Sequence, residues 1–169
     1  MKNVRFLVGA AMAAAVMLAP SKSHAEEYLL YGLGIANSAK YSSAETKILS
    51  VGWRDKFPLG LTQQVEGGHF FDGVTSEGRL SSWWASYSLG VEVENGPILL
   101  RLMIGPEYLA SPDAYLGGHF QFNNDAFVGT RDKTGRSIGI AYKHMSSAGI
   151  ETPNIGRDFL TFQVAVHWW

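Results

Sequence analysis

The chain has 169 residues, a formal net charge of −1 at pH 7 and no cysteine. This length favours a single domain. The lack of cysteine excludes disulfides, thiol catalysis and cysteine-ligated metal sites, and the near-neutral charge argues against nucleic acid as a partner. Aromatic residues make up 12% of the chain and glycine occurs 19 times, a composition that favours an all-β protein.

Residues 1–25 have the pattern of a secretory signal peptide. Two basic residues precede an apolar run at 6–18, and the sequence SHA places small residues at the positions that signal peptidase reads. The apolar run is shorter than the roughly 20 residues that a transmembrane helix needs. The sequence therefore predicts a cleaved signal peptide, 1–25, followed by one exported domain, 26–169.

The exported region alternates apolar and polar residues with a period of two, which is typical of half-buried β-strands. In SWWASYSLGVEV, for example, Trp83, Tyr87 and Val91 share one face, and Ser86 and Glu92 share the other. We predict eight strands by this criterion. Their boundaries are 27–37, 44–55, 62–71, 80–93, 97–110, 117–131, 136–147 and 157–169.

The predicted connections alternate in length. DKFPLG, ENGP and RDKTG are short turns, whereas NSAKYSS, FDGVTSEGR, ASPDAYLG and SAGIETPNIG are longer polar links. Outer-membrane barrels combine short periplasmic turns, longer external loops and an even strand number. A soluble barrel of the lipocalin type would instead turn its apolar face inward, but the opposite faces carry polar residues such as Arg101 and Glu107, which suit a packed interior. We predict an all-β fold, an eight-stranded antiparallel transmembrane β-barrel in the outer membrane of a Gram-negative bacterium.

Three polar residues interrupt the apolar rows of the last two strands. His144 and Ser146 continue the row of Ile140, and Asp158 begins the row of Leu160. Adjacent strands lie about 5 Å apart and same-face neighbours about 7 Å apart, so the three side chains can meet near the outer rim. Polar groups that face lipid are costly unless they bond to one another or have a task. Histidine can accept a serine proton while a carboxylate fixes its tautomer; taken singly, each residue is an ordinary rim residue.

The segment IAYKHMSSAGIETPNIGRD resembles the hallmark region of the lipid A 3-O-deacylase (PagL) family, and FQF at 120–122 resembles another stretch of it. The family pattern is close to H-x-S-N, then a small loop with Pro-Asn and Gly, then an acid 14 positions after the histidine. His144, Ser146, Asn154 and Asp158 fit that pattern. The resemblance covers the last three predicted strands, and the rest of the chain is similar only in layout.

The resemblance implies hydrolysis of the ester that holds the 3-hydroxyacyl chain at position 3 of lipid A. Ser146 would be the nucleophile, His144 the general base and Asp158 the orienting acid, with Asn154 helping to hold the oxyanion. The chain departs from the family at two positions. Asp158 stands where the best-known members have Glu, and Ser147 stands where the pattern has Asn, which puts in question part of the roughly 3–4 kcal/mol that an oxyanion donor provides.

Two other functions remain open from the sequence. The chain could be a non-catalytic or degenerate outer-membrane barrel, or an esterase acting on another outer-leaflet lipid such as a phospholipid. The expected partners are lipid A or lipopolysaccharide as substrate and the surrounding outer-membrane lipid, and a homodimer is left open. The sequence implies no metal and no organic cofactor.

Overall fold

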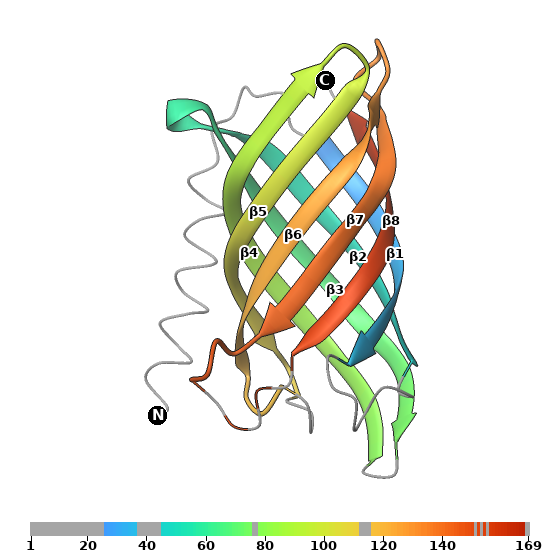
Figure 1. Ribbon diagram of the computed structural model, residues 1–169, viewed down its shortest axis with the longest axis vertical. Helices are drawn as coiled ribbons and strands as arrows, with labels where there is room; N and C mark the ends of the chain where they lie inside the picture. Colours follow the sequence, from blue (N-terminus) through green and yellow to red (C-terminus); the bar gives the residue numbers. More distant parts are fainter. Residues whose placement is uncertain are drawn as a thin grey trace.

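The computed structural model describes residues 26–36, 45–75, 78–111, 116–150, 152, 154 and 156–167. Eight strands follow one another around a closed antiparallel barrel (Figure 1), which confirms the predicted fold. The predicted signal peptide lies outside the described residues. No helix among the described residues is long and apolar enough to cross a bilayer. The elements are β1 Glu26–Ala36, β2 Glu45–Phe57, η2 Pro58–Gly60, β3 Leu61–Thr75, β4 Gly78–Asn95, β5 Ile98–Leu109, β6 Phe120–Arg131, β7 Ser137–Ser146 and β8 Arg157–His167.

One predicted connection is strand instead. The sequence indicated a long link at 71–79, but β3 and β4 continue to pair as far as Thr75 and Gly78 after an irregularity between Phe70 and Gly73. In Figure 1 this hairpin reaches beyond the other strands at one end of the barrel. The ladder continues because antiparallel pairing needs only the backbone, so polar residues outside an apolar wall can still extend a hairpin. Alternation alone therefore underestimated both strands.

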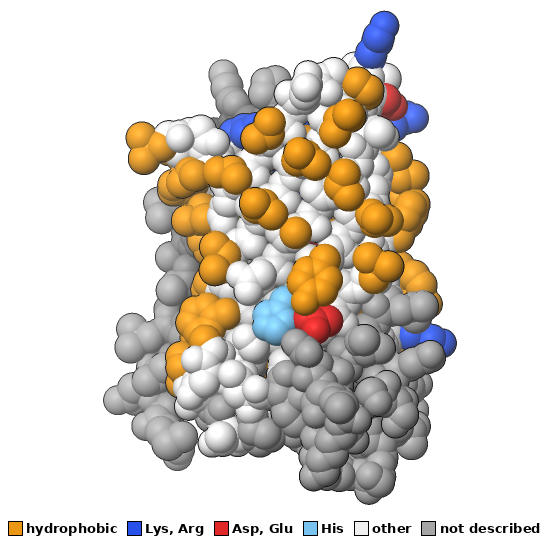
Figure 2. Space-filling model, viewed as in Figure 1, with side chains coloured by type: hydrophobic (Ala, Val, Ile, Leu, Met, Phe, Trp, Pro, Cys, Tyr) orange, Lys and Arg blue, Asp and Glu red, His pale blue; other side chains and the backbone are white. Residues whose placement is uncertain are grey.

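The outer wall of the barrel is apolar on most strands, and Figure 2 shows orange side chains spread over one face of it. Such a wall is what contact with hydrocarbon requires, because a small barrel has a polar interior and an outward apolar band. The predicted orientation of the faces is therefore the one observed. Exposed apolar side chains include Leu29, Tyr31, Val51, Trp83, Leu100, Leu102, Ile104, Ile138, Ile140, Leu160 and Phe162.

The interior holds paired charges. Lys143 Nζ lies 2.9 Å from Glu66 Oε2, Ser50 Oγ donates to Glu66 Oε1 at 2.6 Å, and the same ammonium lies 4.4 Å from the centroid of the Trp84 ring. Buried charges are tolerated when they are paired and hydrogen-bonded. This arrangement ties β7 to β2, β3 and β4 through the barrel interior.

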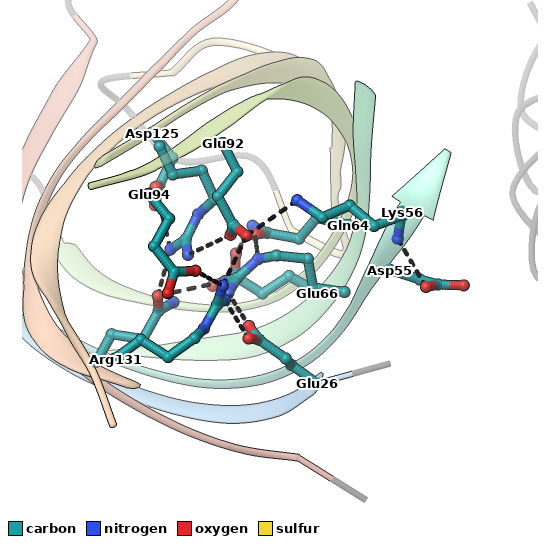
Figure 3. Close-up of polar contacts among 12 residues, drawn as sticks. Glu26, Asp55, Lys56, Gln64, Glu66, Glu92, Glu94, Asp125 and Arg131 are labelled. Carbon is teal, nitrogen blue, oxygen red and sulfur yellow. Dashed lines mark hydrogen bonds and ion pairs between the residues drawn. The ribbon is translucent and has the colours of Figure 1, made fainter. Parts of the chain in front are cut away.

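A second group of charges lies inside the barrel at the end that carries the short turns (Figure 3). Arg131 contacts the carboxylates of Glu26, Glu92 and Glu94, and Arg54 NH1 lies 2.9 Å from Glu26 Oε2. These contacts join β1, β2, β4 and β6. The interior thus combines paired charges with a buried apolar cluster that includes Phe70, Trp84 and Phe159.

Candidate active site

The centre of the candidate site is a histidine–aspartate pair on the outer wall. His144 of β7 and Asp158 of β8 lie directly opposite each other in the antiparallel register. His144 Nδ1 is 2.6 Å from Asp158 Oδ1, and the two side chains are only 24% and 18% exposed. In Figure 2 one histidine and one acidic side chain lie side by side below the apolar wall. The pair sits where β7 ends and β8 begins, at the end of the barrel opposite the short turns.

Ser146 lies beside this pair on the same face. It is the last residue of β7, is half-buried, and lies opposite Phe122 of β6. No hydrogen bond joins its hydroxyl to His144 in the described part of the chain. Gly156 adjoins both residues, because a Cβ built on it would lie 3.1 Å from His144 Cε1 and 3.6 Å from Ser146 Cβ. The structure therefore brings His144 and Asp158 into contact and places Ser146 next to them.

Buried neighbours on the opposite face fix both strands at the site. His144 stands between Lys143 and Met145, whose side chains are both fully buried in the interior. On β8, Phe159 follows the aspartate and stacks on Phe70 with ring centroids 5.5 Å apart. Because side chains alternate across a strand, each outward polar residue is held by inward anchors on either side.

A tyrosine is also part of the site. Tyr142, two residues before His144 on the same face of β7, donates a hydrogen bond from its hydroxyl to Asp158 Oδ1 at 2.6 Å. This is the same oxygen that lies 2.6 Å from His144 Nδ1. Sequence reasoning missed this contact, although the period of two does place Tyr142 and His144 on one face.

The connection after β7 begins with a tight turn. Ile150 N–H donates to the Ser147 carbonyl at 3.0 Å, and Ala148 and Gly149 have φ values of 52° and 81°, as in a type I′ turn. Asn154 Oδ1 accepts the Ser147 backbone N–H at 2.8 Å. The Ser147 side chain is fully buried, so this residue meets Asn154 through its backbone. The bonded oxygen leaves the Asn154 amide NH₂ as the group available to a ligand.

Two further polar features lie on the outer wall. Asn124 of β6 is exposed and lies opposite His144 in the register. Ser81 Oγ and His69 Nε2 form a second serine–histidine contact at 3.2 Å, but no carboxylate contacts the His69 ring within the described residues. No cluster of three candidate metal ligands occurs in that part of the chain either.

Comparisons with known proteins bear on the family and the fold of this chain. The family model described as lipid A 3-O-deacylase (PagL) matches residues 47–167. A crystal structure of the outer membrane enzyme PagL superposes with a TM-score of 0.58 and 17% identity, covering 83% of this chain and 98% of that chain. Neisserial surface protein A gives 0.57 and 11%, covering 86% and 97%, and a de novo designed transmembrane β-barrel gives 0.55 and 11%, covering 88% and 98%.

At such low identities these structures share the barrel fold with this chain. No curated protein matches the sequence. The family model, in contrast, spans most of the chain, from early in β2 to the end of β8, and includes both His144 and Asp158. The chain belongs to the lipid A 3-O-deacylase (PagL) family.

Proposed function

We propose that this protein is a serine esterase of the outer membrane that hydrolyses the ester holding the 3-hydroxyacyl chain at position 3 of lipid A. One observation carries the proposal. A histidine bonded to a carboxylate lies beside a serine on the outer, apolar wall of a barrel from this family. In a membrane such a wall is covered by lipid, so a water-soluble substrate does not contact it, whereas a lipid of the outer leaflet lies against it.

The first half of the reaction is acyl transfer to the enzyme. The His144 Nδ1 proton is donated to Asp158, so the Nε2 lone pair is the one available as a base. Ser146 Oγ attacks the ester carbonyl carbon while its proton passes to His144 Nε2. Collapse of the tetrahedral intermediate breaks the bond to the sugar oxygen, which takes the proton from His144. The acyl chain is then an ester of Ser146.

The second half returns the enzyme to its starting state. A water molecule gives a proton to His144 Nε2 and attacks the acyl carbon, and the bond to Ser146 Oγ breaks as that proton returns to the serine. The products are a free 3-hydroxy fatty acid and lipid A with a hydroxyl at position 3. Asp158 holds the imidazole through Nδ1 and stabilises the imidazolium that forms.

Donors for the oxyanion come from the connection after β7. The Asn154 NH₂ group and the backbone N–H groups of Ala148 and Gly149 are the candidates in our proposal. The Ser147 N–H is excluded from this role because it is already bonded to Asn154 Oδ1. Each well-placed donor contributes about 3–4 kcal/mol to catalysis, so replacement of the family asparagine by Ser147 need not abolish activity.

The wall next to the site supplies a surface for the acyl chains. Ile138, Ile140, Leu160 and Phe162 are all about half exposed or more and lie on the short-turn side of the His144–Asp158 pair. Hydrocarbon can lie along this surface while the sugar headgroup stays at the rim. We propose that residues 1–25 direct export of the chain towards this membrane as a signal peptide and are then cleaved off.

Mass spectrometry of lipid A tests the proposal. Gram-negative cells that express the full chain should lose one 3-hydroxyacyl group from their lipid A, and Ser146→Ala should abolish that loss. Ser81→Ala is the matched control, because it also removes a wall hydroxyl beside a histidine, but at a pair that lacks the acid; it should keep activity. Unchanged lipid A with a folded barrel would indicate a non-catalytic protein, and fatty acid released only from phospholipid would indicate a different esterase.

A further inference from the structure

We propose that Tyr142 is a positioning residue that holds the Asp158 carboxylate in place for His144. This inference rests on the proposed function. The observation behind it is that two donors converge on one oxygen: the Tyr142 hydroxyl and His144 Nδ1 each lie 2.6 Å from Asp158 Oδ1. The carboxylate is thereby fixed from two directions.

The register explains how the tyrosine reaches the acid. His144 pairs with Asp158 and Tyr142 pairs with Leu160, so Tyr142 is a diagonal neighbour of the acid, on the side of the membrane interior. A diagonal separation of about 7–8 Å is within reach of an aromatic side chain. The ring thus spans the gap between the strands, and its hydroxyl meets the carboxylate from the side opposite the rim.

The position of the acid creates the need for such a donor. A carboxylate on an apolar wall is costly unless it is hydrogen-bonded. The cationic residues that flank the site in sequence, Lys143 and Arg157, are buried on the opposite face of their strands, where they bond Glu66 and Thr46. Among the described residues, Tyr142 and His144 are therefore the donors to Asp158.

The length of the acid makes its orientation important. An aspartate has one methylene fewer than a glutamate, so rotation about its χ1 bond carries its oxygens away from His144 on the neighbouring strand. The tyrosine bond removes that freedom. No other charged side chain of β6, β7 or β8 faces this point within the described residues.

The test compares Tyr142→Phe with Tyr31→Phe. The two tyrosines are matched, since their side chains are 49% and 48% exposed on the outer wall, but no carboxylate bonds the Tyr31 hydroxyl in the described part of the chain. With purified lipopolysaccharide in mixed micelles, Tyr142→Phe should lower kcat about 10- to 100-fold, as expected for losing a hydrogen bond to a charged group, and leave KM within about twofold. Tyr31→Phe should match the wild type in both kcat and KM.

A second variant and a structural readout separate the inference from the proposed function. Adding Asp158→Glu to Tyr142→Phe should restore part of kcat, because the longer acid can reach His144 without the tyrosine. In nanodiscs, the downfield NMR signal of the His144 Nδ1 proton should be present in the wild type and lost by exchange in Tyr142→Phe. If the wild-type protein leaves lipopolysaccharide intact, the proposed function is refuted. The NMR comparison of the wild type with Tyr142→Phe would then be the test of whether Tyr142 positions Asp158. An unchanged proton signal, or an unchanged kcat in an active enzyme, would overturn the role of Tyr142.

Discussion

Gly156 offers a direct test of how closely the connection before β8 is fitted to the site. Its φ is +74°, a left-handed conformation that side chains rarely adopt, and an added Cβ would lie 3.1 Å from His144 Cε1 and 3.2 Å from the Met145 carbonyl oxygen. Gly156→Ala therefore acts twice. It strains the backbone, and it presses a methyl group against the imidazole that is bonded to Asp158.

The two effects have different magnitudes and different readouts. An alanine in the left-handed region costs about 1–2 kcal/mol, which lowers stability but not the activity of each folded molecule. A contact of 3.1 Å is closer than ordinary van der Waals contact, so the ring must shift by a fraction of an ångström. Because a misplacement of about 1 Å can cost 100-fold in rate, we expect a loss of about 10-fold in kcat.

Urea unfolding in lipid vesicles and deacylation per folded molecule measure these effects separately. Gly60→Ala is the matched control, because Gly60 has a φ of +75° but nothing within 4 Å of an added Cβ, and it lies at the far end of the barrel. It should lose similar stability and keep full activity. If Gly156→Ala were as active per folded molecule as Gly60→Ala, the fit between this glycine and His144 would have no catalytic meaning.

Two further predictions concern stability. Lys143→Met leaves the buried Glu66 without its ion-pair partner and should destabilise the barrel by about 3–5 kcal/mol, with much of the loss recovered by adding Glu66→Gln; denaturant unfolding followed by tryptophan fluorescence measures both. At the β6–β7 turn, the Thr134 hydroxyl, the Thr134 N–H and the Arg136 N–H all donate to Asp132, which lowers the pKa of Asp132 below its usual range. An acid whose pKa is lowered by folding stabilises the fold at pH values above its ordinary pKa near 4, and this stabilisation is lost as the pH falls through the pKa of the folded state. Asp132→Ala should therefore make the free energy of unfolding fall less steeply with decreasing pH. Identical curves of unfolding free energy against pH for the wild type and the variant would contradict this.

The barrel was predictable because its outer wall and interior impose a period of two on most strands. Charged residues on the face opposite the apolar rows, such as Arg101 and Glu107, were predicted to point inward, and both side chains are buried. The boundaries failed at the β3–β4 hairpin, which extends past the apolar wall to Thr75 and Gly78. Outside the wall, pairing depends on the backbone alone, and no hydrophobic pattern records it.

The part of the candidate site that could be predicted is the part that follows from strand parity, the alternation of side chains between the two faces of a strand. Parity places His144, Ser146 and Asp158 on one face, and the structure shows them there, but their catalytic roles stay a proposal. Parity could not supply the Tyr142 contact, because it does not specify which same-face neighbours bond. The role of Asn154 as an acceptor for the Ser147 N–H depends on the path of the connection after β7, and a path through turn residues leaves no periodic signal.

If the proposed activity is correct, the arrangement gives a physical reason why two barrel strands suffice to hold a site for a membrane lipid. A soluble hydrolase must enclose its substrate to exclude water, whereas here the bilayer itself excludes water from the acyl chains. The strands need only hold a few polar groups at the rim, and alternation does this at low cost, because the residue that follows each outward polar group is an inward anchor: Met145 after His144 and Phe159 after Asp158. Precision in such a site comes from the interior packing, so changes to interior anchors should disturb catalysis even though none of them can touch the substrate.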